Sequence, residues 1–245
     1  MPVPTEKLKQ PSVIEAVCEF RFTTGVSYTM VPGAMNERLR PKFPSSEVLP
    51  TATLMGGIPE EIVTPQIPHH RFRSQSPNAL VQTGPRLLTV NVLPIYPGFE
   101  VFRELILFVL EQYGQVAQPG SPSKIGLRYI NHFPQSTGRN GLSDYFKLPI
   151  SYPTELPHPP GETAVRFVLP YSDLGTLGLA IAFPARTGTG ESGALLDLDF
   201  SWSNPSKLDL KDFPGWLDKA HEVIYTAFTS IVLDDIMAEM KGGRV

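Results

Sequence analysis

Charged side chains alternate with apolar ones along three stretches of the sequence. They are Glu15, Glu19 and Arg21 in residues 11–22, Arg128 and His132 in residues 124–133, and Asp197 and Asp199 in residues 194–202. In a β-strand, residues two apart point to the same face. We therefore expect these side chains to form the polar face of one sheet, and we take them as the candidate binding residues.

Two carboxylates at positions i and i+2 can hold a metal ion or share acid–base work, and Asp197 and Asp199 have this spacing. Hydrolytic metal sites usually need further ligands, often histidine. The candidates are His69, His70, His132, His158 and His221. Because nothing in the sequence brings them near the aspartates, we predict no metal site and no cofactor. One alternative stays open, a hydrolase or nuclease whose metal or acid–base groups are Asp197, Asp199, Glu19 and His132.

The same polar face has two further interpretations. It can be a ladder of ion pairs between strands, in which Arg21 and Arg128 each meet a carboxylate and each pair contributes ~0.2–1 kcal/mol. It can also be a groove that binds a ligand, a peptide or a nucleic-acid strand. For single-stranded RNA, the phosphate contacts would come from Arg21, Arg71, Arg73 and Arg128.

The sequence does not assemble a motif for nucleophilic catalysis. "GESGA" (190–194) has the wrong spacing for a nucleophile elbow. "GTGESG" (188–193) precedes a strand, whereas phosphate binding needs a following helix. Cys18 lies on the apolar face of its strand, so we predict an inert core thiol. His221 borders the apolar stripe of the last helix and is predicted to make a flank contact. The catalytic residues, if there are any, are therefore unknown.

The first half of the chain follows one order of elements. "PSVIEAVCEFRF" (11–22) alternates strictly, which predicts a strand with Ile14, Ala16, Cys18, Phe20 and Phe22 on the buried face and Val13, Glu15, Val17, Glu19 and Arg21 on the other. A short helix (30–40) and a proline-rich loop (41–68) follow. Three strands come next, "HHRFRSQ", "NALVQTG" and "PRLLTVNVL". An amphipathic helix over 98–114 closes this half, with Gly114 as its stop.

The second half repeats that order. "KIGLRYINHF" (124–133) predicts a strand with Tyr129 and Asn131 facing the helices, and we expect Asn131 to be a buried, hydrogen-bonded side chain. A short helical piece (142–148) and a second proline-rich loop (149–160) follow. The strands "AVRFVLPY", "LGLAIAFP" and "ALLDLDFSW" and one long helix over 213–239 complete the half.

These patterns predict an α+β fold built from two similar β-α-β-β-β-α halves. The halves span 1–118 and 119–245 and form one globular unit with a largely antiparallel sheet. The two long helices are expected to pack on one face of that sheet. We also expect the first strands of the halves to lie side by side at the sheet centre, and the two proline-rich loops to be able to flank one groove.

Composition narrows the classes of function. The chain has 245 residues, a formal charge of −3, one cysteine and 26 prolines, about twice the usual share of proline. It has no long basic run, which argues against a general nucleic-acid binder. A single cysteine fits a reducing compartment, and the apolar stretches are too short to span a bilayer. We therefore expect a soluble cytoplasmic protein without membrane contact, and an oligomer is possible.

Several stretches resemble a known family of prokaryotic proteins. They are "PSVIEAVCEFRF", "ALVQTGPRLLTVN", "YPGFEVFRELI", "KIGLRYINHF", "LLDLDFSW" and "AHEVIYTAFTSIV". The family is sporadically distributed and has no assigned function, and the run "GLRYIN" (126–131) is the most specific match. His132 stands where the family commonly has a basic or polar residue. The resemblance implies a shared fold and a bacterial origin, and the sporadic distribution suggests a conflict or defence system. It supplies no catalytic residues.

The leading functional hypothesis is therefore a non-enzymatic binding or accessory module. We expect it to recognise a protein partner, or a nucleic acid, through the polar sheet face or the proline-rich loops.

Overall fold

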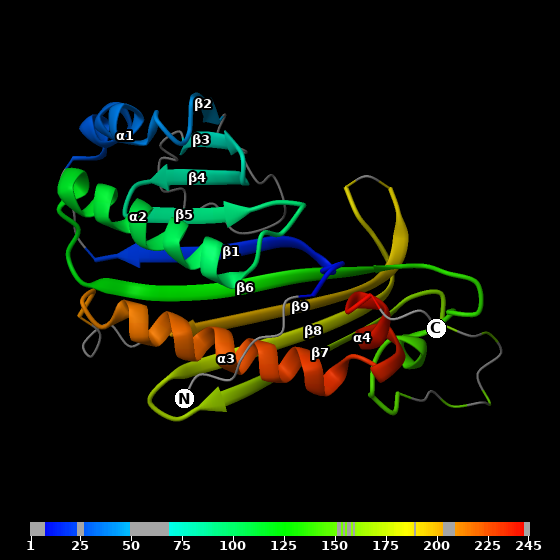
Figure 1. Ribbon diagram of the computed structural model, residues 1–245. Coiled ribbons are helices and arrows are strands. Elements are labelled where there is room, and N and C mark those ends of the chain that lie inside the picture. The colour runs from blue at the N-terminus through cyan, green and yellow to red at the C-terminus, as the bar shows by residue number, and fades with distance from the viewer. Residues whose placement is uncertain are drawn as a thin grey trace, which may run out of the picture.

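An antiparallel sheet of nine strands forms the frame of the computed structural model (Figure 1). The structure describes residues 8–23, 27–49, 69–150, 160–188, 190–202 and 209–242, with Pro153, Glu155 and His158. The strands are β1 (Val13–Phe22), β2 (Ser45–Leu49), β3 (His69–Gln75), β4 (Asn78–Gly84), β5 (Leu87–Val92), β6 (Pro122–Pro134), β7 (Thr163–Tyr171), β8 (Gly175–Arg186) and β9 (Ser192–Trp202). Their order across the sheet is β2-β3-β4-β5-β1-β6-β9-β8-β7. The expected α+β class with a largely antiparallel sheet is confirmed.

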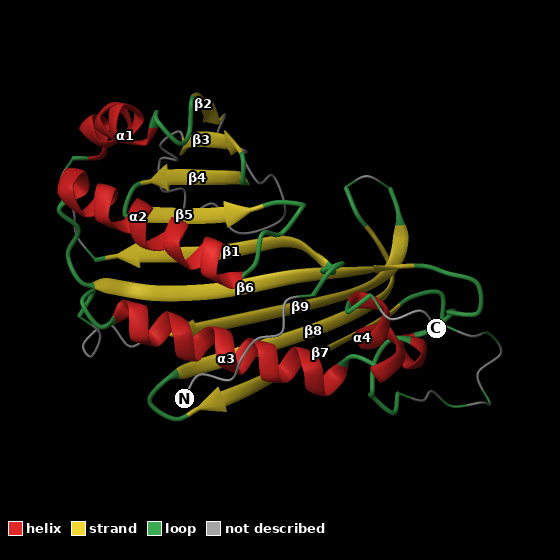
Figure 2. Ribbon diagram, viewed as in Figure 1, coloured by secondary structure: helices red, strands yellow, loops and turns green. Residues whose placement is uncertain are grey.

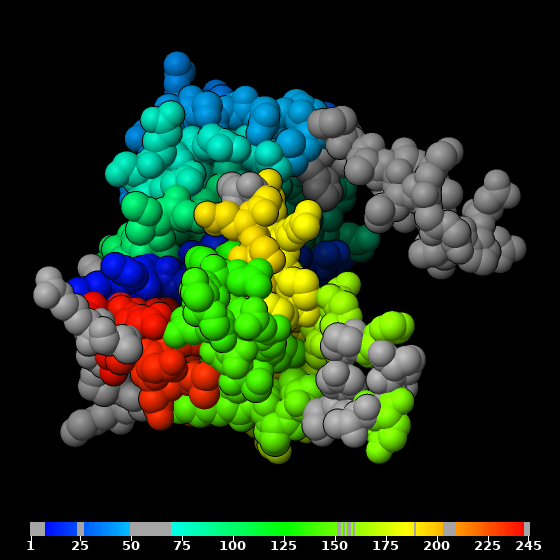
Figure 3. Space-filling model, turned by 90° about the vertical axis from the view of Figure 1, so that its right-hand side faces the viewer, coloured from blue at the N-terminus to red at the C-terminus, as the bar shows by residue number. Residues whose placement is uncertain are grey.

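The first strands of the two predicted halves, β1 and β6, pair with each other at the centre of this sheet. The alternation of apolar and polar residues in β1 fits this central position, because it leaves Ala16, Cys18 and Phe20 fully buried on one face of the strand. Burial raises the pKa of the Cys18 thiol well above its ordinary value, which keeps the thiol protonated. In the side view of Figure 3, the blue-to-cyan residues lie mainly above the green-to-red ones.

Four α-helices in the described part of the chain accompany the sheet: α1 (Val31–Leu39), α2 (Phe99–Ala117), α3 (Phe213–Ile231) and α4 (Asp234–Met240). Figure 2 shows α2 and α3 crossing in front of the strands. Their apolar stripes enter the core, where Phe102, Ile106 and Leu217 are completely buried. Phe213 meets Phe20 of β1 edge to face, with 4.8 Å between ring centroids. Among the described residues, none of the helices is long and apolar enough to cross a membrane.

Two predicted boundaries in the first half of the chain are wrong. The stretch 41–68 is not all loop, because β2 lies in it and pairs with β3; residues 50–68 lie outside the described part of the chain. Helix α2 continues past Gly114 to Ala117, and Gln118 takes the left-handed conformation that ends it. Much of the second proline-rich loop also lies outside the description.

The single helix expected over 213–239 is divided into α3 and α4. Val232 is extended and forms a β-bridge with Phe146. The backbone N–H of Lys147 donates to the carbonyl of Ile231, and that of Leu233 donates to the carbonyl of Tyr145. These bonds satisfy backbone groups that a continuous helix would have used, so the helix stops there. The expected helical piece over 142–148 contains only a 3-10 turn, Leu142–Asp144.

Candidate functional site

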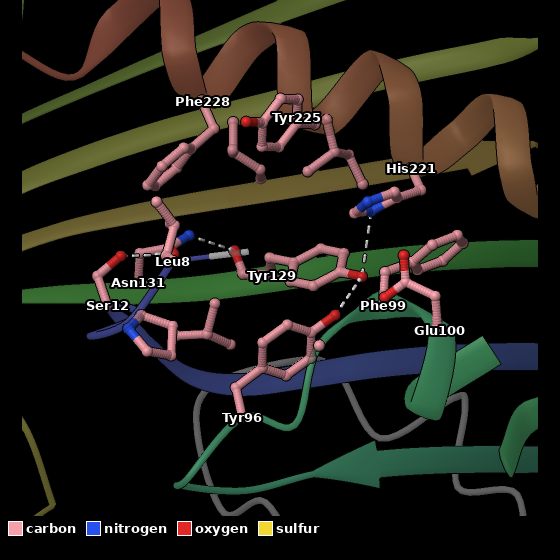
Figure 4. Close-up of a pocket in the computed structure, with 15 residues that line it drawn as sticks. Leu8, Ser12, Tyr96, Phe99, Glu100, Tyr129, Asn131, His221, Tyr225 and Phe228 are labelled. Carbon is pink, nitrogen blue, oxygen red and sulfur yellow. Dashed lines mark hydrogen bonds between the residues drawn. The ribbon is translucent and has the colours of Figure 1, made fainter. Parts of the chain in front are cut away.

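A cavity of about 360 Å³ opens between the N-terminal segment, the start of α2, the middle of β6 and one face of α3 (Figure 4). It is lined by Leu8, Pro11, Ser12, Val13, Tyr96, Gly98, Phe99, Glu100, Tyr129, Asn131, Leu198, His221, Ile224, Tyr225 and Phe228. We call it the aromatic pocket. Its volume falls at the lower end of the range typical of small-molecule sites, roughly 300–1,000 Å³.

Most of these side chains point into the cavity because of their positions in regular strands and helices. Tyr129 and Asn131 are two apart on β6, so both point to the helix side of the sheet. On α3, residues 221, 224, 225 and 228 recur at steps of three and four, which gathers them on one face of the helix. Phe99 and Glu100 stand in the first turn of α2. The pocket thus joins segments from both halves of the sequence.

Val13 reaches the pocket through an irregularity of β1. Strict alternation would place it with Glu15 on the polar face, as the sequence predicted. The pairing of β1 with β6 shifts register between Val13 and Glu15, so the two side chains do not share a face. Val13 instead lines the pocket and packs against the core.

Three polar side chains form a hydrogen-bonded chain along one wall of the pocket. The hydroxyls of Tyr96 and Tyr129 are 3.1 Å apart, and the Tyr129 hydroxyl is 3.3 Å from Nδ1 of His221. The imidazole of His221 stacks on the ring of Phe99, with 3.7 Å between centroids and 9° between planes. Figure 4 shows these rings grouped around the Tyr129 hydroxyl.

Burial determines the protonation states of the three polar side chains along this wall. It raises the pKa values of Tyr129 and Tyr96, so both phenols are protonated at neutral pH. It also lowers the pKa of His221 to about 4, with the charge of Asp218 opposing the shift, so the imidazole is neutral at pH 7. Nε2 of His221 is buried and has no hydrogen-bond partner among the described residues.

The opposite wall is closed by Asn131, which was expected to be buried and hydrogen-bonded. It is 1% exposed, and its amide nitrogen donates to the carbonyl of Leu196 at 3.3 Å. Its side-chain oxygen accepts a 3.0 Å hydrogen bond from the hydroxyl of Ser12. Asn131 therefore ties the N-terminal segment to β6 and fixes that rim of the pocket.

The predicted polar residues lie outside the pocket, and several of them pair with one another. Arg128 donates two hydrogen bonds to Asp197, at 2.8 and 2.6 Å. Arg21 binds Glu19 on its own strand at 2.8 Å, rather than a carboxylate on a neighbouring strand. Burial would raise the pKa of Glu19, but the hydrogen bond and charge of Arg21, with Lys124, outweigh it and lower that pKa. These contacts form a ladder of partly exposed pairs, each of which contributes little stability.

Glu15, Asp199 and His132 complete the predicted set. Glu15 accepts a 2.7 Å hydrogen bond from the amide of Asn91. Burial raises the pKa of Asp199, although Lys124 and Arg128 oppose the shift.

His132 is 5% exposed and pairs across the sheet with Leu195, not with either aspartate. Burial lowers its pKa, and the charge of Glu191 opposes that shift. Within the described ranges, no group of three or more His, Cys, Asp or Glu side chains is arranged to hold a metal ion. The four residues of the hydrolase alternative therefore do not form such a group, and the side chain of His69 lies outside the description.

The arginines proposed for RNA contact are largely engaged with other side chains. Arg71 forms an ion pair with Glu47 at 3.2 Å and also donates to Gln82. Arg21 and Arg128 also form ion pairs, so a nearby carboxylate offsets the charge of all three arginines. Arg73 lies opposite Leu80 of β4 and Ser45 of β2. Phosphate contacts at this face would require the existing ion pairs to break.

The sequence alone did not predict the aromatic pocket. Its periodicity predicted Tyr129 and Asn131 on the helix side of the sheet and His221 beside the apolar stripe, each in a structural role. The available signal was the recurrence of aromatic residues at the helix-facing positions of β6 and α3. Nothing in the local pattern showed that Tyr96 and Phe99 lie against them.

Comparison with known proteins adds no relative. A scan against models of protein families finds no match for this chain, and a search of curated proteins finds none either. The resemblance to a sporadically distributed prokaryotic family therefore stays a prediction.

Proposed function

We propose that this chain is a binding protein whose aromatic pocket receives a small, largely apolar ligand. The observation that carries this proposal is the cavity itself, which is lined by aromatic and aliphatic side chains with a few polar groups at its walls. Small-molecule sites have this composition, because apolar contact supplies affinity and a few polar groups fix orientation.

The chemistry of the pocket favours binding over catalysis. With a pKa of about 4, His221 is a weak proton acceptor at neutral pH. The raised pKa values of Tyr96 and Tyr129 make their phenolates poorly accessible as nucleophiles or bases. These groups can hold a ligand by hydrogen bonds and ring contacts without transferring a proton.

Indole is a suitable first probe, because it is neutral, aromatic and small enough for the cavity. We expect indole to shift the amide NMR signals of residues that line the pocket. Val13→Phe should weaken this binding by about tenfold or more, because the larger ring occupies part of the cavity. Val17→Phe makes the same change on the same strand at a residue that does not line the pocket, and it should leave binding unchanged. Shifts spread over other surfaces, or equal weakening by both variants, would contradict the proposal.

A protein partner is a second candidate function, and the edge strand β7 favours it. Among the strands that the structure describes, β8 is its only neighbour. Phe167, Val168 and Leu169 are 40%, 59% and 40% exposed. An apolar edge of this kind can accept an extended segment of another protein as a further strand. A role in a bacterial conflict or defence system belongs to this second proposal and depends on the family resemblance.

This second candidate can be tested by purification from the native host with three baits. Proteins that bind β7 should accompany the wild-type chain and be lost with Val168→Lys, which places a charge in the apolar edge. Val48→Lys is the matched control, because Val48 is also 59% exposed and lies on the opposite edge strand, β2. The idea fails if no protein is lost with Val168→Lys alone.

We further propose that the chain arose by duplication of one β-α-β-β-β-α unit, with halves spanning 1–118 and 119–245. The strand order supports this proposal, because β1 and β6 lie side by side and the strands that follow each of them run from an edge of the sheet inward. The last strand of each half, β5 or β9, therefore lies beside the first, and only β2 has no counterpart among the described strands of the second half. In each half, a long helix follows the last strand. An experimental structure in which the two halves do not superpose over these elements would count against it.

A further inference from the structure

We propose that the aromatic pocket is selective for organic amines. In this proposal, the apolar body of the ligand fills the cavity and its protonated nitrogen lies between the carboxylate of Glu100 and the ring faces and hydroxyls of the tyrosines. The inference rests on the proposed binding function and names the class of ligand.

The lining of the pocket carries negative charge and no positive charge. Of the fifteen residues that line the pocket, Glu100 is the only one charged at neutral pH, since His221 is neutral. Glu100 is exposed and makes no ion pair with any residue in the described part of the chain. Its charge is therefore available to a ligand.

Glu100 lies at the polar wall of the pocket. In the view of Figure 4, its side chain points toward the Tyr129 hydroxyl. Its negative charge contributes to the raised pKa values of Tyr96 and Tyr129, which agrees with that proximity. A carboxylate next to two protonated phenols offers hydrogen-bond acceptors to an ammonium group, whereas it repels an anionic ligand.

The rings add to this preference. Tyr96, Phe99, Tyr129, Tyr225 and Phe228 surround the cavity from four segments of the chain. The face of an aromatic ring carries negative charge density, so it attracts a cation that lies over it. One face of Phe99 is covered by His221, so that face is not available to a cation.

Three probes with the same indole body separate the contribution of charge from that of shape. They are protonated tryptamine, neutral tryptophol and the anion indole-3-acetate. Titrations followed by NMR at pH 7 should give tryptamine a dissociation constant about tenfold lower than that of tryptophol, with indole-3-acetate the weakest. Glu100→Gln should remove most of the advantage of tryptamine and change tryptophol binding little. Glu104→Gln, one turn later on α2 and outside the pocket lining, should keep the advantage.

The outcomes distinguish this inference from the function on which it rests. If tryptamine and tryptophol bind in the pocket with equal affinity, amine selectivity is wrong while the pocket still binds ligands. Equal losses in Glu100→Gln and Glu104→Gln would also overturn it, because they would show a general effect of net charge. If none of the three probes nor indole perturbs the lining residues, both proposals fail.

Discussion

Lowering the pH from 7 to 4 is expected to reduce the free energy of unfolding by about 3 kcal/mol through His221 alone, with about 2 kcal/mol already lost at pH 5. The folded-state pKa of His221 is about 4, against an ordinary value of 6.5. Between these values the unfolded chain binds a proton that the folded chain does not bind. The stability contributed by neutral His221 is therefore complete above pH 6.5 and is lost as the pH falls toward 4.

The physical cause is the packing of the imidazole. It stacks on Phe99, bonds to the Tyr129 hydroxyl, and keeps Nε2 away from solvent. A second proton would place a charge in this apolar contact without hydration. The carboxylate of Asp218 favours that charge, but it is engaged by Arg103 at 2.6 Å.

Urea denaturation at pH 7, 6, 5 and 4 measures this dependence. His221→Gln has no titrating group at position 221. Its loss of stability between pH 7 and the lower pH should therefore be smaller than that of the wild type, by about 2 kcal/mol at pH 5 and about 3 kcal/mol at pH 4. His158→Gln removes an exposed histidine and should follow the wild-type curve. Parallel curves for wild type and His221→Gln would show that His221 is accessible to protons in the folded state.

Gly193→Ala is expected to destabilise the protein by about 3 kcal/mol or more. Gly193 lies in β9, between Pro134 of β6 and Ala185 of β8. A Cβ atom at this position would collide with the carbonyl oxygen of Phe133 and lie 2.8 Å from Nε2 of His132. Because the carbonyl belongs to a central strand, the backbone of β6 or β9 would have to move.

Gly141→Ala is the matched control for this substitution. A Cβ atom at Gly141 meets no atom within 4 Å, and its backbone is extended, with φ of −156°. Thermal and urea unfolding should therefore give a much smaller change for Gly141→Ala than for Gly193→Ala. Failure of Gly193→Ala to fold would agree with the prediction, whereas wild-type stability for Gly193→Ala would contradict the close approach of β6 and β9.

Local periodicity determined most of the secondary structure. Alternation in 11–22 and 124–133 predicted the two strands that pair at the centre of the sheet, and it placed Arg128 and Asn131 on opposite faces. Steps of three and four residues predicted α2 and the main part of the last helix. These features depend on which side of one element is buried, and a sequence records that directly.

Only the tertiary structure decided the features that depend on contacts between distant segments. The bridge of Val232 to Phe146 ended α3, and the register shift after Val13 turned that side chain into the pocket. The sequence by itself determined that Tyr129 and His221 stand at helix-facing or boundary positions. It did not determine that these two residues, 92 positions apart in the chain, are joined by a hydrogen bond. A side-chain contact between a strand and a distant helix leaves no local pattern in the sequence.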